Sequence, residues 1–148
     1  MKRIVFALLA LFVFTGAAIA GGGLDGFLRN LNIQAQADLN GFSARLSAQF
    51  GIPEVQVRTV ISTVKEPSDA FMCLQLGHWT QKPPEQVVRI YKANQGKGWG
   101  VIAKSMGIKP GSAEFHALKN GNLTFNGQPA GESERPGKSK GRGKGHNK

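Results

Sequence analysis

One cysteine and three histidines are the residues of this chain best suited to nucleophilic or metal chemistry. Cys73 lies five positions before His78, and His116 follows in a later segment, so a nucleophile with its base or a set of metal ligands can be imagined around them. A closed zinc site requires about four ligands at recognisable spacing, and a helical metal pair requires histidines about four positions apart. Neither pattern occurs, so we expect no catalytic residue, no metal and no cofactor. Because Cys73 stands in the apolar stretch AFMCLQL, we interpret it as a buried, unreactive thiol.

A second candidate is the glycine-rich segment GKGWG at residues 96–100. Glycine-rich backbone before a helix can present N–H groups to an anion, and Lys97 and Lys104 are close in sequence. The segment lacks the full phosphate-loop pattern. The alternative, which we favour, is that the glycines permit a sharp turn while Trp99 packs into the core.

Basic residues are the feature most suited to binding a partner. Without Lys2 and Arg3 the chain has 17 basic and 9 acidic residues, a net charge of +8, of which +4 lies in residues 131–148. The candidate anion-binding residues are Lys97, Lys104, Lys109, Lys119, Arg135, Lys138, Lys140, Arg142, Lys144 and Lys148. Cations spaced by glycine and serine can follow a phosphate or acidic glycan chain and gain from counterion release. A tail that only keeps the protein soluble is the open alternative.

The first twenty residues have the pattern of a Sec-type signal peptide. Lys2 and Arg3 precede an apolar run from Ile4 to Phe14, and Ala18 and Ala20 fit the small-residue rule for cleavage after Ala20. The apolar run has 11 residues, whereas a membrane-spanning helix requires about 20. We therefore expect a cleaved signal, a periplasmic or extracellular protein, and no membrane span after cleavage.

The rest of the chain predicts an all-α fold, a compact bundle of five or six short helices with helix-turn-helix-like corners. We assign residues 1–20 to the signal peptide, 21–34 to a loose leader, 35–121 to the helical domain and 122–148 to a disordered Gly/Lys-rich basic tail. Leu123 and Phe125 are expected to pin the start of that tail to the core.

Capping and stop residues set the expected helix ends. Gly51 and Gly107 can take the left-handed conformation that stops a helix, and Gly77 is expected to end the central apolar helix. Ser68 and Ser112 are expected to cap the starts of their helices. Capping explains Ser112 better than a catalytic pairing with His116 does.

The corner IAKSMGI at residues 102–108 is similar to the helix-turn-helix family, with Ala103 four positions before Gly107. The corner LSAQFGIPEVQVRTVI, which starts at Leu46, has the same design, and two such corners favour a packing explanation. A helix that reads base edges needs Arg, Lys, Asn or Gln side chains aimed at them, but the segment SAEFHALK after IAKSMGI offers Glu114, His116 and Lys119. The turn before it is also lengthened by residues 109–111, so we expect no sequence-specific DNA reading.

The export signal, the block GWGVIAKSMGIKPGSAEFHALK and the glycine/lysine-rich end together resemble small, uncharacterised secreted helical proteins of bacteria. The resemblance implies a location but no activity. Our first hypothesis is an exported, non-enzymatic protein that binds extracellular DNA, lipopolysaccharide or acidic polysaccharide. The alternative is a protein-interaction or structural component of the cell envelope or secreted matrix. Oligomeric state stays open.

Overall fold

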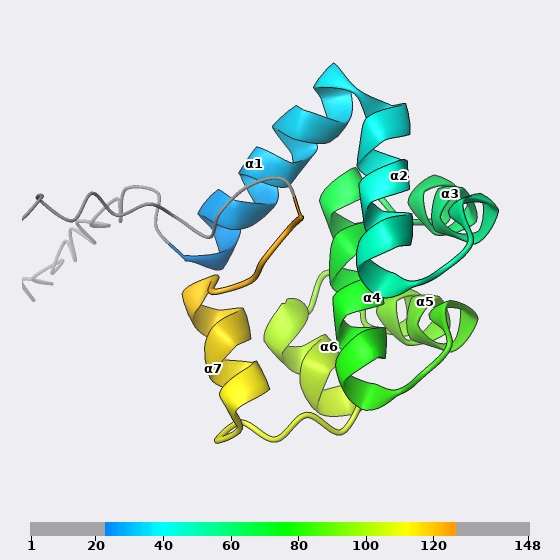
Figure 1. Ribbon diagram of the computed structural model, residues 1–148. Coiled ribbons are helices and arrows are strands. Elements are labelled where there is room, and N and C mark those ends of the chain that lie inside the picture. Colours follow the sequence, from blue (N-terminus) through cyan, green and yellow to red (C-terminus); the bar gives the residue numbers. More distant parts are fainter. Residues whose placement is uncertain (1–22, 127–148) are drawn as a thin grey trace, which may run out of the picture.

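The computed structural model describes residues 23–126, and these form seven α-helices and no strand (Figure 1). The helices are α1 (Leu24–Ala37), α2 (Leu39–Phe50), α3 (Glu54–Thr63), α4 (Pro67–Thr80), α5 (Pro84–Ala93), α6 (Trp99–Ser105) and α7 (Ala113–Asn120). The all-α prediction is confirmed, and seven helices stand where five or six were expected. The predicted signal peptide and the predicted tail from residue 127 onward lie outside the described residues.

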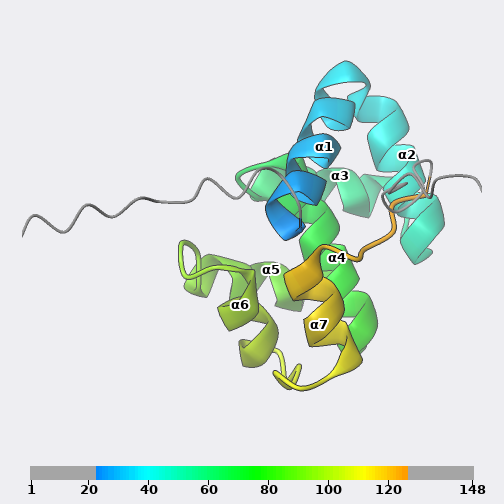
Figure 2. The same ribbon diagram turned by 90° about the vertical axis from the view of Figure 1, so that its left-hand side faces the viewer.

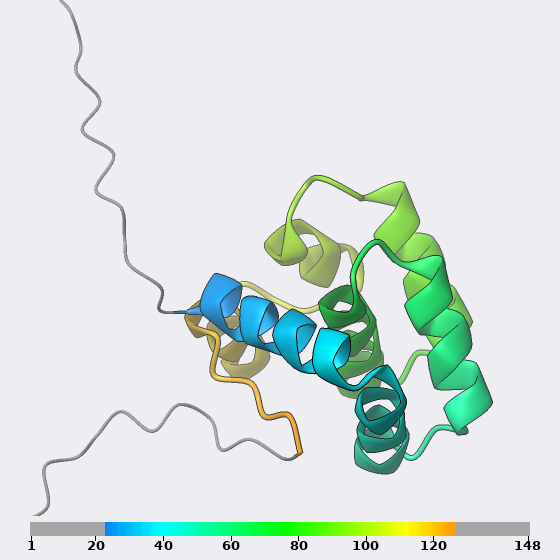
Figure 3. The same cartoon turned by 90° about the horizontal axis from the view of Figure 1, so that it is seen from above.

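Helix α4 occupies the centre of the domain because it is apolar nearly all round. Every residue from Ala70 to Gly77 is buried, so the helix has no solvent face over two turns. It packs against α1, α2, α3 and α5, and the view from above shows the other helices arranged around it (Figure 3). A helix that is hydrophobic all round must be surrounded in this way.

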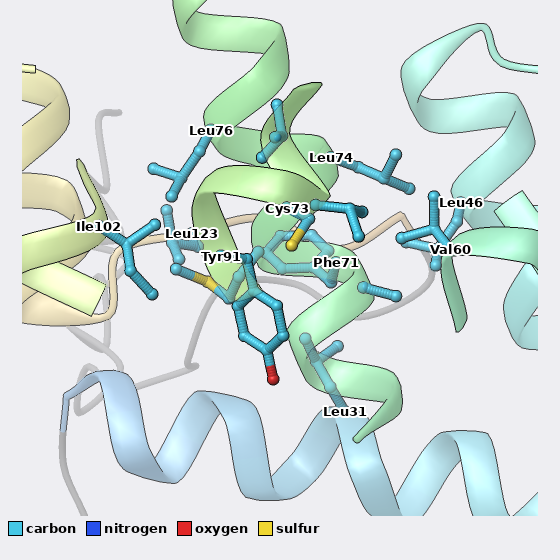
Figure 4. Close-up of a cluster of buried hydrophobic side chains, with 14 of the residues drawn as sticks. Leu31, Leu46, Val60, Phe71, Cys73, Leu74, Leu76, Tyr91, Ile102 and Leu123 are labelled. Carbon is cyan, nitrogen blue, oxygen red and sulfur yellow. The ribbon is translucent and has the colours of Figure 1, made fainter. Parts of the chain in front are cut away.

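The core gathers side chains from every helix. Figure 4 shows part of it around α4, with Leu31 of α1, Leu46 of α2 and Ile102 of α6 among the labelled residues. Phe71 of α4 is fully buried at its centre, and its ring contacts Phe27, Phe50 and Phe125 at centroid distances of 5.2, 5.8 and 6.2 Å. Edge-to-face aromatic pairs of this kind add to the free energy gained by burial alone.

The predicted loose leader at residues 21–34 is wrong from Leu24 onward, where α1 begins. Leu31 and Ala35 of α1 are buried against the core, and Phe27 and Leu28 are partly buried there. Asn32 ties the same helix to the start of α4: its Oδ1 accepts a hydrogen bond from the Ser68 backbone N–H at 2.8 Å. Tertiary packing therefore stabilises a helix that its Gly and Asn residues disfavour.

The assignment of residues 122–126 to a disordered tail is also wrong, whereas the expectation that Leu123 and Phe125 pin this segment to the core is confirmed. Both side chains are buried. Gln49 of α2 fastens the backbone around them, because its Nε2 donates to the Thr124 carbonyl at 2.7 Å and its Oε1 accepts from the Asn126 N–H at 2.9 Å.

The predicted stops at Gly51 and Gly107 are confirmed, with φ values of 64° and 94°. The predicted stop at Gly77 is wrong, since α4 continues to Thr80 and Gln81 takes the left-handed conformation instead. Gly77 is required for packing: a Cβ there would lie 3.0 Å from the Lys82 carbonyl oxygen. The Lys82 N–H donates to the Gly77 carbonyl at 3.0 Å, which closes the turn.

Ser112 caps α7 as predicted, because its Oγ accepts a hydrogen bond from the Phe115 N–H at 3.2 Å. Ser68 does not cap α4. Glu66 occupies the cap position and forms a capping box with Asp69, which leaves Ser68 buried in the first turn.

Helices α6 and α7 form the outer part of the domain. They pack against each other, and they are held to the rest mainly through α5 and α1 (Figure 2). The two corners that resemble helix-turn-helix motifs, α2–α3 and α6–α7, are both closed by the hydrogen bonds of a glycine stop, with Ile52 N–H donating to Ser47 and Ile108 N–H to Ala103.

Candidate functional site

Charge is divided unevenly along the sequence. Residues 23–91 contain six basic and six acidic residues, whereas residues 92–148 contain eleven basic and three acidic residues. The described part of that second segment, residues 92–126, contains five lysines and one acidic residue, Glu114. The charges of residues 23–91, which contain the first four helices and most of α5, are therefore balanced, and the surplus of positive charge begins with Lys92 in the last turn of α5.

The four lysines predicted as anion-binding residues in the domain are all exposed. Lys97 precedes α6, Lys104 is in its last turn, Lys109 lies in the α6–α7 corner and Lys119 is in the last turn of α7. None of them forms an ion pair; in residues 23–126 the ion pair present joins Arg58 and Glu54 at 2.7 Å. Their ammonium groups are therefore available to an external anion.

The segment GKGWG forms a sharp turn, as we favoured. Gly96 and Gly98 have φ values of 85° and 89°, and the Trp99 ring stacks on Tyr91 at a centroid distance of 5.5 Å. Lys104 lies at the opposite end of α6, about 8 Å along the helix axis. Lys97 and Lys104 therefore do not converge on the N–H groups at the start of that helix. The remaining candidate residues, Arg135, Lys138, Lys140, Arg142, Lys144 and Lys148, lie outside the described residues.

Cys73 and His78 line one cavity of about 240 Å³ beneath the α2–α3 corner, and His116 does not contribute to it. Phe50 and Ile52 form the wall from that corner, and Gly77, Gln81, Lys82 and Pro84 close the other side. No hydrogen bond joins Cys73 to His78. Burial raises the pKa of the Cys73 thiol to about 12, so the thiol stays protonated and is a poor nucleophile. The interpretation of Cys73 as a buried thiol is confirmed.

A second cavity, of about 300 Å³, lies on the other side of Phe50 and His78, between α2, α4 and the segment after α7. Its polar lining consists of Gln49, Gln75, His78, Asn122 and Thr124. Its apolar lining consists of Phe50, Trp79 and Leu123. We call it the Gln75 cavity. No charged aspartate, glutamate, lysine or arginine side chain lines it.

Gln75 is the residue of this site that sequence reasoning missed. It is the polar member of the apolar stretch AFMCLQL, and only 8% of it is exposed. The one signal for it was a glutamine inside a run that is otherwise apolar, because a buried amide requires a hydrogen-bonding partner.

A separate polar cluster joins α4 to α5. Tyr91 donates a hydrogen bond from its hydroxyl to Asp69 Oδ2 at 2.7 Å, and the Glu66 N–H donates to the same oxygen at 3.2 Å. Burial raises the pKa of the Asp69 carboxyl, and these hydrogen bonds partly oppose the rise. Burial, together with the Asp69 hydrogen bond, raises the pKa of Tyr91 to about 12. The cluster joins structural elements and opens into no cavity described above.

In residues 23–126, no group of three or more His, Cys, Asp or Glu side chains is arranged to hold a metal ion. None of the helices in this part of the chain combines the length and apolar character required to cross a membrane. No family model, curated protein or solved structure matches the chain. The site must therefore be interpreted from its own residues.

Proposed function

We propose that the protein is an exported, non-enzymatic binder of anionic polymers, and that its C-terminal part carries the binding. The observation that supports this most directly is the division of charge, with balanced residues 23–91 followed by a surplus of eight positive charges in residues 92–148. Charge gathered in one part of a chain attracts a polyanion more strongly than the same charge spread evenly.

The four exposed lysines of residues 97–119 are the proposed binding residues that belong to the folded domain. Each lysine that neutralises a phosphate or sulfate releases a counterion, so binding weakens as salt rises. The six cations of residues 135–148 add to the same effect. If all six engage duplex DNA, their share of the log–log salt slope is about −5.

Export is part of the proposal and rests on the N-terminal sequence pattern, with the charged start, the short apolar run and Ala18 and Ala20 before the cleavage point. Partners available outside the cytoplasm are extracellular DNA, lipopolysaccharide and acidic polysaccharide. Recognition by charge requires no base-reading helix, so the proposal does not depend on base contacts by SAEFHALK.

The test is retention on heparin and on duplex DNA over a range of salt. Three proteins are compared with the mature chain: one lacking residues 131–148, one with Lys97, Lys104, Lys109 and Lys119 changed to Gln, and one control. The control changes four exposed cations of the balanced part, Arg29, Arg45, Lys65 and Arg89, to Gln. It loses the same net charge from a different place.

We expect the deletion to cause the largest loss of retention, the four-lysine variant a smaller loss, and the control the least. Retention that is unchanged by both the deletion and the four-lysine variant would overturn the proposal. A control that weakens binding as much as the four-lysine variant would show that net charge, not its location, governs binding.

Two exposed apolar side chains favour the second candidate, a protein-interaction or structural component of the envelope or matrix. Ile33 on α1 and Leu39 at the start of α2 are 57% and 49% exposed, beside the α1–α2 junction. Changing both to Ser would abolish capture of an envelope protein under this alternative and leave heparin retention intact. Loss of retention without loss of capture would favour the first candidate.

A further inference from the structure

The Gln75 cavity contains a buried polar group without a partner. In the described part of the chain, Gln75 forms no side-chain hydrogen bond, although it is more than nine-tenths buried. No fully buried side-chain nitrogen or oxygen in this part of the chain lacks a partner. The amide oxygen and nitrogen of Gln75 must therefore both reach accessible surface, and the surface that this residue lines is the cavity. A primary amide offers a donor and an acceptor side by side.

The neighbouring polar groups differ in whether they are already engaged. Gln49 uses both ends of its amide to hold Thr124 and Asn126, so it fixes the wall of the cavity and has little left to offer a ligand. The Trp79 indole N–H, the His78 ring nitrogens and the side-chain amide of Asn122 make no hydrogen bond within residues 23–126. Together with Gln75 they surround the cavity with unused donors and acceptors.

The lining also indicates the charge of the ligand. No carboxylate, ammonium or guanidinium group lines the cavity, and the imidazole of His78 is the one lining group that can take up a charge, so the lining is mainly neutral and favours an uncharged ligand. An uncharged ligand that presents hydroxyl groups can satisfy amides that both donate and accept. The aromatic rings of Phe50 and Trp79 offer apolar contact to a ligand that has an apolar face as well.

The volume of about 300 Å³ is at the lower end of small-molecule sites. It suits a single six-membered ring. His78, Asn122 and Thr124 at its margin are exposed, so the ring can enter from solvent and can belong to a longer chain.

We propose that the Gln75 cavity binds one uncharged sugar unit, with the Gln75 amide bonded to its hydroxyl groups and the Trp79 or Phe50 ring against its C–H face. None of the four exposed lysines lines this cavity, and the proposal does not rest on polyanion binding. It would let the protein recognise a glycan by its composition as well as by its charge.

The experiment is a titration of ¹⁵N-labelled mature protein, followed by NMR, with glucose, galactose, mannose and N-acetylglucosamine, each alone. Salt of about 0.5 M screens the exposed lysines and so separates sugar binding from the polyanion binding tested by heparin and DNA retention. The chain has two tryptophans, so the indole N–H signals provide an internal comparison. We expect at least one sugar to shift the signals of Trp79 and of the Gln75 side-chain amide with a saturating curve, while the signal of Trp99 stays in place.

The matched variants are Gln75→Leu, which removes the amide and keeps the volume, and Gln86→Leu on α5, which makes the same change outside the cavity. Removal of one good hydrogen-bonding group should weaken sugar binding about tenfold or more, and Gln86→Leu should leave it unchanged. The unsubstituted protein keeps the proposal testable if Gln75→Leu does not fold, because the Gln75 amide signals are observed directly.

Two results would overturn the proposal. One is the absence of saturable shifts around the cavity with all four sugars. The other is that inorganic phosphate, added as a charged probe, shifts the Gln75 and Trp79 signals while the neutral sugars do not.

Discussion

The first five helices and the part of the domain that follows them are built for different tasks. Residues 23–91 surround the central helix α4, bury most of the aromatic core and balance their charges. Residues 92–126 form two short helices that pack mainly on α1 and α5, and they expose lysines without acidic partners. Both parts contribute buried side chains to one core, and the second part also supplies the surplus of positive charge.

The difference teaches that a binding surface of this kind requires little packing of its own. Long-range attraction to a polyanion depends on how many charges are exposed and how close they are, not on a shaped pocket. A short pair of helices can present such charges on its exposed side while its buried side chains join the common core. Changes in the two parts should therefore have separable effects, and the following predictions test this from the largest effect to the smallest.

The largest effect is expected from Phe71→Ala in the centre of the core. The ring is fully buried and contacts three other phenylalanines, so its removal should lower the free energy of unfolding by about 3–5 kcal/mol. Phe115→Ala on α7, where 9% of the residue is exposed, should cost less. Urea unfolding of both variants measures the difference; an equal loss at the two positions would contradict the view of α7 as peripheral.

The second prediction concerns the contact between the two ends of the domain. Gly121 has a φ of 68°, and a Cβ on it would lie 2.3 Å from the Gly23 carbonyl carbon. Gly121→Ala should cost about 3 kcal/mol, because left-handed strain and a backbone clash act together. Gly51→Ala is the matched control, since Gly51 has a similar φ of 64° and open space around it; it should cost about 1 kcal/mol. Equal effects in thermal or urea unfolding would rule out a role for the contact between α1 and α7.

Alkaline pH should destabilise the protein through two buried groups of the first part. The ordinary pKa values are 9.0 for Cys73 and 10.0 for Tyr91, and burial raises both to about 12. Between these values the unfolded chain releases protons that the folded chain retains, so the free energy of unfolding falls as pH rises. Tyr91→Phe should reduce the loss between pH 10 and 12, and Cys73→Ala should reduce it between pH 9 and 12. A pH profile of urea midpoints that is the same in both variants and the parent would exclude these groups as its cause.

The smallest effect on stability is expected from changing the exposed lysines that are proposed to bind polyanions. Changing Lys97, Lys104, Lys109 and Lys119 to Gln should alter the free energy of unfolding by less than about 0.5 kcal/mol for each exposed site. Circular dichroism during heating measures this. A cooperative loss of stability would show that the lysines hold the fold together, and the separation of the two parts would then fail.

Local sequence signals predicted the helices well wherever a helix has its own periodic pattern and its own stop. Gly51, Gly107 and Ser112 act where their conformational and capping preferences place them. The same reasoning was wrong at α1, whose apolar positions are diluted by glycine and asparagine, because α4 supplies the packing that the segment lacks in isolation. It was wrong at Gly77 for a related reason: the close approach of the Lys82 carbonyl explains this glycine, and no stop signal does.

The candidate sites divide in the same way. The order of residues alone placed the positive charge near the C-terminus and made an all-helical domain the expected fold, because charge runs and hydrophobic period are properties of the local sequence. Only the tertiary structure could bring Gln75 of α4 together with Gln49 of α2 and Asn122 after α7, since these residues are far apart in the chain and no local pattern links them.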